Sequence, residues 1–149
     1  MTARSCTPRA YGLIMSALTL LFFLRVAGQA LVAFFHVSFL PAMQEWYSGL
    51  ISYPVLLPIQ CAILVFMAKV SFDLVKGSGF FVTARLKLGR FLIAFSCVYF
   101  AAMVFRYGLT MLLHPERRWL GGSIPIFFHF VLAGYLFVWG RFNTTRGAS

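Results

Sequence analysis

Polar side chains recur at helical spacing in the first long apolar stretch of the sequence. Arg25, Gln29 and His36 stand at positions i, i+4 and i+11, which return to nearly the same side of an α-helix. One helix face would therefore carry three polar groups among apolar neighbours. Because ionisable groups are costly inside a bilayer, such groups are candidates for function.

Three other apolar stretches contribute polar groups as well. Gln60, Arg106 and His129 each stand inside one of them. At 1.5 Å of rise per residue, Gln29, Arg106 and His129 would each lie on the order of 10 Å below the outer surface, so we expect them to meet. The predicted ligand-binding pocket comprises Arg25, Gln29, Gln60, Arg106 and His129 and opens outward. Two arginines without a carboxylate inside these stretches favour an anionic or carbonyl-bearing ligand.

The same residues also have a purely structural interpretation. Arg25 and Arg106 would then bind backbone carbonyls freed by Pro54 and Pro58, or extend toward the membrane surface. Polar side chains between membrane helices also stabilise packing. Contact with a partner subunit is a third alternative, so the pattern leaves the role of both arginines open.

The histidines raise the alternative of a haem site, since membrane bundles can hold haem b between imidazoles of facing helices. His36 and His114 fall near the outer ends of their stretches, and His129 falls deeper. Only His36 paired with His129 suits this geometry. No helix has the two histidines that stacked haems require, and we predict no other cofactor and no metal site.

Enzyme motifs are missing from the sequence. The acidic residues Glu45, Asp73 and Glu116 stand between the apolar stretches, which leaves no paired carboxylates for acid and base catalysis and no buried carboxylate for proton-coupled export. HExxH and GxSxG are absent too. We therefore favour a protein that is not an enzyme.

Membrane helices are the elements that must position these groups. The 149 residues are 61% hydrophobic and 11% charged, whereas a soluble domain has about 25% charged residues. We predict an all-α integral membrane protein, an up-and-down bundle of four transmembrane helices forming a single membrane domain over residues 1–149. The expected spans are 11–38, 48–70, 91–113 and 120–140, with a basic loop at 73–90. Pro54 and Pro58 should kink the second span.

The basic residues predict the orientation. Two flank the ends that we expect outside, Arg117 and Arg118, and nine flank the other ends: Arg4, Arg9, Lys69, Lys76, Arg85, Lys87, Arg90, Arg141 and Arg146. Such a bias places both termini in the cytoplasm. Trp46 and Trp139 should then lie in the outer and inner aromatic belts. We expect a bacterial inner (plasma) membrane as the location.

The expected partners are lipids and other membrane subunits. The basic loop should contact anionic headgroups, and the apolar faces should pack in a homo-oligomer or a larger membrane complex. Nucleic acid is excluded, because the basic residues flank apolar runs instead of forming a polar module. Asn143 starts an N-glycosylation tripeptide that we attribute to chance, since it falls in the cytoplasmic tail.

The favoured function is that of a small accessory subunit or a lipid- or quinone-type ligand binder. One alternative is a haem- or quinone-linked redox protein that uses His129 and His36. Another is an oligomeric channel or transporter for a small anionic solute.

Overall fold

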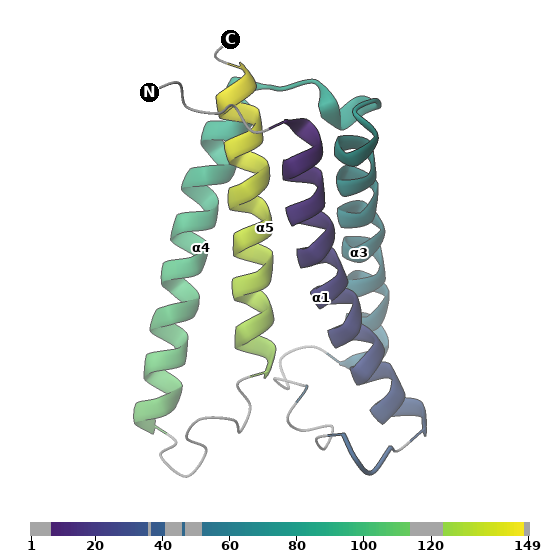
Figure 1. The fold of residues 1–149 in the computed structure, drawn as a ribbon. Helices are drawn as coiled ribbons and strands as arrows, with labels where there is room; N and C mark the ends of the chain where they lie inside the picture. Colours follow the sequence, from purple (N-terminus) through teal and green to yellow (C-terminus); the bar gives the residue numbers. More distant parts are fainter. Residues whose placement is uncertain (1–6, 36, 41–45, 47–51, 114–123, 148–149) are drawn as a thin grey trace.

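Four long apolar helices are present, as predicted, in the computed structural model, which describes residues 7–35, 37–40, 46, 52–113 and 124–147. Within these ranges the secondary structure is helical, with no strand (Figure 1): α1 (Pro8–Phe35), α3 (Tyr53–Lys76), the short 3₁₀ helix η1 (Phe80–Val82), α4 (Leu86–Leu113) and α5 (Ile124–Gly147). All four α-helices are long and apolar enough to cross a membrane. This is typical of a multi-pass integral membrane protein.

The helices continue further into the basic segments than predicted. α3 runs on to Lys76 and α4 already begins at Leu86, so the expected loop at 73–90 shrinks to residues 77–85. Lysine and arginine are good helix formers and do not end a helix. The chain leaves α3 at Gly77, where a φ of 72° suits glycine and the N–H bonds to the carbonyl of Asp73 at 2.9 Å.

The two prolines of α3 have different positions. Pro54 stands in the first turn, after the N-cap Ser52, where the missing N–H has no helical partner in any case. The expected kink at Pro54 is therefore wrong, because the helix starts later than predicted. Pro58 does lie inside the helix.

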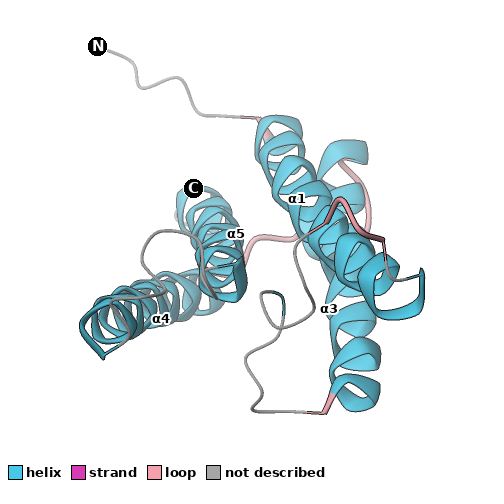
Figure 2. Cartoon of the chain, turned by 90° about the horizontal axis from the view of Figure 1, so that it is seen from below, coloured by secondary structure: helices cyan, strands magenta, loops and turns pink. Residues whose placement is uncertain are grey.

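The helices alternate in direction, and both termini lie at one end of the molecule, called here the terminal end (Figure 1). Packing joins α4 to α5, α5 to α1 and α1 to α3. Over the described residues, α3 and α4 share no extensive contact, so the helices form a curved row in the order α4, α5, α1, α3 (Figure 2). The up-and-down order agrees with the prediction, whereas the row is more open than a closed bundle.

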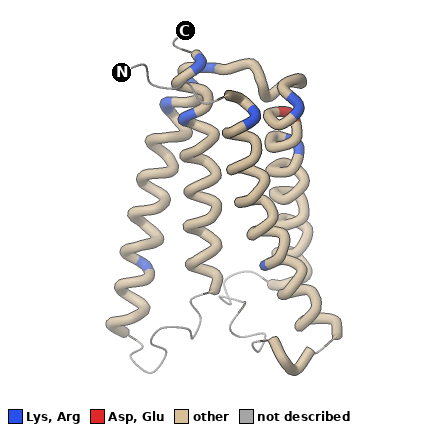
Figure 3. Tube along the Cα trace, in the orientation of Figure 1, with Lys and Arg blue, Asp and Glu red and all other residues tan. Residues whose placement is uncertain are grey.

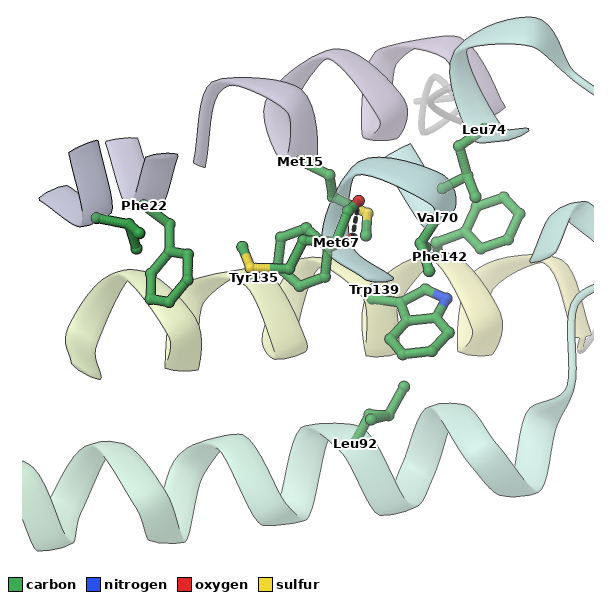
Figure 4. Packing of buried hydrophobic residues seen from close by; sticks show 10 residues of the cluster. Met15, Phe22, Met67, Val70, Leu74, Leu92, Tyr135, Trp139 and Phe142 are labelled. Atoms are coloured by element: carbon green, nitrogen blue, oxygen red, sulfur yellow. Dashed lines mark hydrogen bonds between the residues drawn. The ribbon is translucent and has the colours of Figure 1, made fainter. Parts of the chain in front are cut away.

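Buried side chains of α1, α3 and α5 form the core, and Leu92 of α4 joins them (Figure 4). Tyr135 of α5 is 2% exposed, and its hydroxyl donates to the backbone oxygen of Met67 on α3 at 2.8 Å. Trp139 packs edge-on against Phe66 and Phe81. Trp139 is therefore a core residue and not part of an exposed aromatic belt.

Close backbone approach joins α4 to α5. A Cβ added at Gly140 would lie 3.0 Å from the backbone oxygen of Gly89, and one added at Gly89 would lie 2.9 Å from that of Gly140. Asn143 is 1% exposed, and its side chain accepts from the Arg85 N–H at 2.9 Å and donates to the carbonyl of Trp139. The asparagine of the glycosylation tripeptide thus has a structural role, because its side chain on α5 hydrogen-bonds to the backbone just before α4.

Candidate functional site

A cavity of about 250 Å³ lies in the half of the molecule away from the terminal end, where α5 begins. All four helices and Trp46 contribute to its wall. Most of the lining is apolar, from Phe22, Leu56, Ile59, Ile63, Pro125, Phe128 and Leu132, and the polar members are Arg25, Gln60, Tyr99 and His129. An apolar cavity with a few convergent polar groups is the usual form of a small-molecule site.

Arg25 is the charged residue of this wall. The residue is 8% exposed. Its Nη2 donates to the backbone oxygen of Trp46 at 3.4 Å, and its Cζ lies 5.8 Å from the centre of the Phe128 ring. Nε is buried and has no hydrogen-bond partner in the described part of the chain. The described ranges contain one acidic residue, Asp73, which pairs with Lys69 near the terminal end (Figure 3). Arg25 is therefore a buried cation that lacks a carboxylate partner among these residues.

Two glutamine amides form a series of hydrogen bonds that ends at a wall residue, Gln60. Gln29 is fully buried; its Nε2 donates to the backbone oxygen of Trp46 at 3.5 Å, and its Oε1 accepts from Gln60 Nε2 at 3.2 Å. Gln60, which is 4% exposed, reaches the cavity. The amides therefore connect α1, Trp46 and α3 around the guanidinium of Arg25.

Tyr99 and His129 form the opposite side of the wall. The hydroxyl of Tyr99 on α4 hydrogen-bonds to Nδ1 of His129 on α5, and both residues line the cavity. Nε2 of His129 is not used in this hydrogen bond. That nitrogen remains available to a ligand as a donor or an acceptor, depending on the tautomer.

The structure brings together three of the five predicted pocket residues. Arg25, Gln60 and His129 line the cavity. Gln29 contacts Gln60 but lies behind the wall, with no exposed surface. Arg106 is not part of the wall, because the α4 residue there is Tyr99, seven positions and thus about 10 Å nearer the terminal end.

Trp46 is a wall residue that the sequence analysis placed elsewhere. We expected it in an aromatic belt, yet it is 8% exposed and lines the cavity. A signal was present in Gly28, three residues after Arg25: a Cβ there would lie 2.7 Å from the Trp46 ring. The indole of Trp46 packs in the space that Gly28 leaves by having no side chain.

The haem alternative concerns His36 and His129, of which His129 lines the wall. His36 and His114 lie outside the described residues, so the pairing of His36 with His129 stays a prediction. His129 would offer Nε2 to a haem iron, and it is the one histidine among the described wall residues. No group of three His, Cys, Asp or Glu residues in the described ranges is placed to hold a metal ion.

Basic side chains gather at the terminal end (Figure 3). Ten lysines and arginines are described, and all except Arg25 and Arg106 stand at or near the helix ends there. The cavity and the basic end therefore occupy opposite halves of the molecule. A comparison with protein-family models, curated proteins and solved structures finds no match to this chain, so its function is inferred from this geometry.

Proposed function

We propose that the chain is a multi-pass integral membrane protein that binds an apolar molecule with an oxygen-bearing head, of the lipid or quinone type. The observation that carries the proposal is Arg25, a buried guanidinium on the wall of an apolar cavity without a carboxylate partner in the described ranges. A buried cation is expensive unless it is paired. A ligand oxygen would supply the missing partner.

The outer surface supports insertion into a membrane. α4 has three buried residues in its 28, and its large apolar side chains, such as Phe91, Phe105 and Leu112, are more than 60% exposed. Exposing such a surface to water is unfavourable, whereas lipid tails solvate it. The separation of basic residues to the terminal end favours both termini in the cytoplasm. Helical spans favour an inner membrane as the bacterial location, since outer-membrane proteins span as barrels.

The cavity supports a ligand over packing alone. Packing between helices normally fills the space beside a buried polar group, but here about 250 Å³ remains next to Arg25, Gln60 and His129. The apolar lining suits a hydrocarbon stem, and the guanidinium suits a carbonyl or carboxylate oxygen. The proposal therefore places the head of the ligand at Arg25 and its tail among Phe22, Ile59 and neighbouring side chains.

Two kinds of partner belong to this proposal. The basic terminal end would contact anionic lipid headgroups. The exposed apolar face of α4 would pack against a second copy or another subunit. Cross-linking in native membranes, followed by gel analysis, would detect a protein partner on α4 and distinguish it from a face that is covered by lipid.

Gentle purification tests the ligand. The full chain is extracted in a mild detergent, and the organic extract is compared by mass spectrometry with the total membrane lipid. We expect enrichment of one apolar compound that carries a carbonyl, carboxyl or hydroxyl head. An extract with the composition of the bulk lipid would contradict the proposal.

A redox role is the second candidate, and the Tyr99–His129 hydrogen bond favours it. If the phenol oxygen accepts from Nδ1–H, Nε2 is left unprotonated and able to bind a metal, as in many histidine ligand sites. The test is an absorption spectrum of the purified protein. A Soret band that disappears in His129→Ala supports a haem site, and a colourless preparation excludes a bound haem.

A further inference from the structure

We infer that the head of the ligand must donate a hydrogen bond as well as accept one, so that hydroxyl- or amide-bearing heads are preferred over heads that only accept. The inference rests on the proposed function, because it concerns the same cavity. Its basis is the direction of the hydrogen bonds from Trp46 through Gln29 to Gln60. That direction determines which atom of Gln60 is left for the ligand.

This series of hydrogen bonds starts at an atom that can act only as an acceptor. The backbone oxygen of Trp46 can only accept, so Gln29 must turn its NH₂ group toward it, and the two atoms are 3.5 Å apart. The Oε1 atom of Gln29 then faces Gln60. Because this oxygen also only accepts, Gln60 must present its own NH₂ group, at 3.2 Å. A backbone carbonyl thus sets the orientation of both amides.

The last acceptor in this series of hydrogen bonds belongs to Gln60, one of the residues that line the cavity. Oε1 of Gln60 is buried and has no hydrogen-bond partner in the described part of the chain. Turning the amide over would bring two acceptor oxygens together at Gln29, so Oε1 and the NH₂ group of Gln60 cannot exchange places without breaking this hydrogen bond. A buried acceptor without a partner is unfavourable. An O–H or N–H of the ligand would relieve it.

Arg25 presents the opposite requirement on the same wall. Its guanidinium can only donate, and Nε is buried without a partner among the described residues. The wall therefore combines one unsatisfied donor with one unsatisfied acceptor. A primary amide, a protonated carboxyl group, a hydroquinone or a hydroxyl beside an ester satisfies both atoms. An ionised carboxylate or an oxidised quinone would satisfy Arg25 and place its lone pairs against Gln60.

The size of the cavity limits the ligand further. Its volume of about 250 Å³ equals roughly eight water-sized groups. The head and the first carbons of a chain would fit, so the remainder must leave the cavity. The wall residues Leu56, Ile59 and Ile63 of α3 give that chain an apolar path.

A matched pair of probes tests the inference. The full chain in lipid nanodiscs is titrated with a long-chain primary amide and with its N,N-dimethyl derivative, which keeps the accepting oxygen and lacks the donor. We expect the primary amide to bind about tenfold more tightly, the size of one hydrogen bond. In Gln60→Met this ratio should fall to near one, while the affinity for the dimethyl amide changes little.

Two further variants keep the result interpretable. Gln60→Met leaves Gln29 Oε1 without its partner, so Gln29→Met/Gln60→Met, which removes both amides, is measured beside it. Thr110→Val on α4 is the control, since Thr110 bonds to the backbone of Arg106 and does not line the cavity. It should retain the tenfold preference.

The outcomes separate the inference from the proposed function. Equal binding of both probes to the unaltered protein overturns the inference and keeps the apolar ligand site; water would then satisfy Gln60 and Arg25. A preference that persists in both Gln60 variants also overturns it, because the donor would be recognised elsewhere. Failure of both probes to bind contradicts the proposed function itself.

Discussion

The guanidinium of Arg25 and the backbone oxygen of Trp46 lie 3.4 Å apart, although 21 residues separate them in the sequence. The same oxygen accepts from Gln29 at 3.5 Å. One backbone carbonyl therefore orients two polar side chains of α1 at the cavity wall. The position of Trp46, which depends on the packing of its ring, controls the geometry of the site.

Gly28 makes that position possible, and enlarging it should disturb the site. In Gly28→Leu the added Cβ would lie 2.7 Å from the Trp46 ring, so the indole must move and carry its carbonyl away from Arg25. We expect a red shift of the tryptophan emission and loss of the bound ligand. Gly108→Leu is the control, because a Cβ at Gly108 meets nothing within 4 Å. Identical spectra for both variants would show that Trp46 does not pack on Gly28.

Tyr135 should stabilise the packing of α5 against α3. Tyr135→Phe removes the hydroxyl that donates to the carbonyl of Met67 at 2.8 Å. Hydrogen bonds between membrane helices contribute on average about 0.6 and at most about 1.7 kcal/mol, so the free energy of unfolding in detergent should fall within that range. Tyr11→Phe is the control, since the Tyr11 hydroxyl makes a longer, exposed contact of 3.4 Å with Thr145. An equal loss in both variants would refute a special role for Tyr135.

Gly140 should be required for the contact of α4 with α5. In Gly140→Ala the Cβ would lie 2.8 Å from Ile93 Cγ1 and 3.0 Å from the Gly89 oxygen. Overpacking of this kind costs roughly 1–3 kcal/mol, to be measured as a lower unfolding free energy in detergent. Gly134→Ala, where a Cβ meets nothing, should be neutral or stabilising by up to about 1 kcal/mol, because alanine favours a helix. Tolerance of alanine at Gly140 would contradict the close approach.

The helices could be predicted from the sequence because membrane spans depend on composition and length. Four apolar stretches gave four helices, and the errors fell at their ends, where Lys76 and Arg141 extend helices that we expected to stop. The open, curved arrangement was not predictable in this way. Close contacts such as Gly89 with Gly140 decide it, and glycines of similar sequence context, such as Gly134, make no such contact.

The site was predicted in part, since helical spacing places residues on a face but does not fix the rotation and depth of each helix. Arg25, Gln60 and His129 line the cavity, whereas Arg106 belongs to a helix that, among the described elements, packs mainly on α5, with Tyr99 at the wall in its place. Trp46 was missed because its burial depends on a tertiary contact with Gly28.

The proposed orientation predicts that both ends of the chain stay in the cytoplasm. Reporter enzymes fused in turn before residue 1 and after residue 149 should both show cytoplasmic activity, because the basic terminal end is retained on that side during insertion. Reporters in opposite compartments would contradict the count of four spans. Two external reporters would contradict the orientation and leave that count intact.

Native mass spectrometry of the Arg25 variants tests the central claim most directly. We expect the unaltered protein to carry one small apolar molecule. Arg25→Gln should lose at least about nine-tenths of it, as removal of a charged hydrogen bond implies. Arg25→Lys should retain an intermediate share, since lysine keeps the charge without the planar guanidinium. Arg106→Gln should retain the molecule, because Arg106 is outside the cavity wall. Equal occupancy in Arg25→Gln and Arg106→Gln, or no bound molecule in the unaltered protein, would contradict the account.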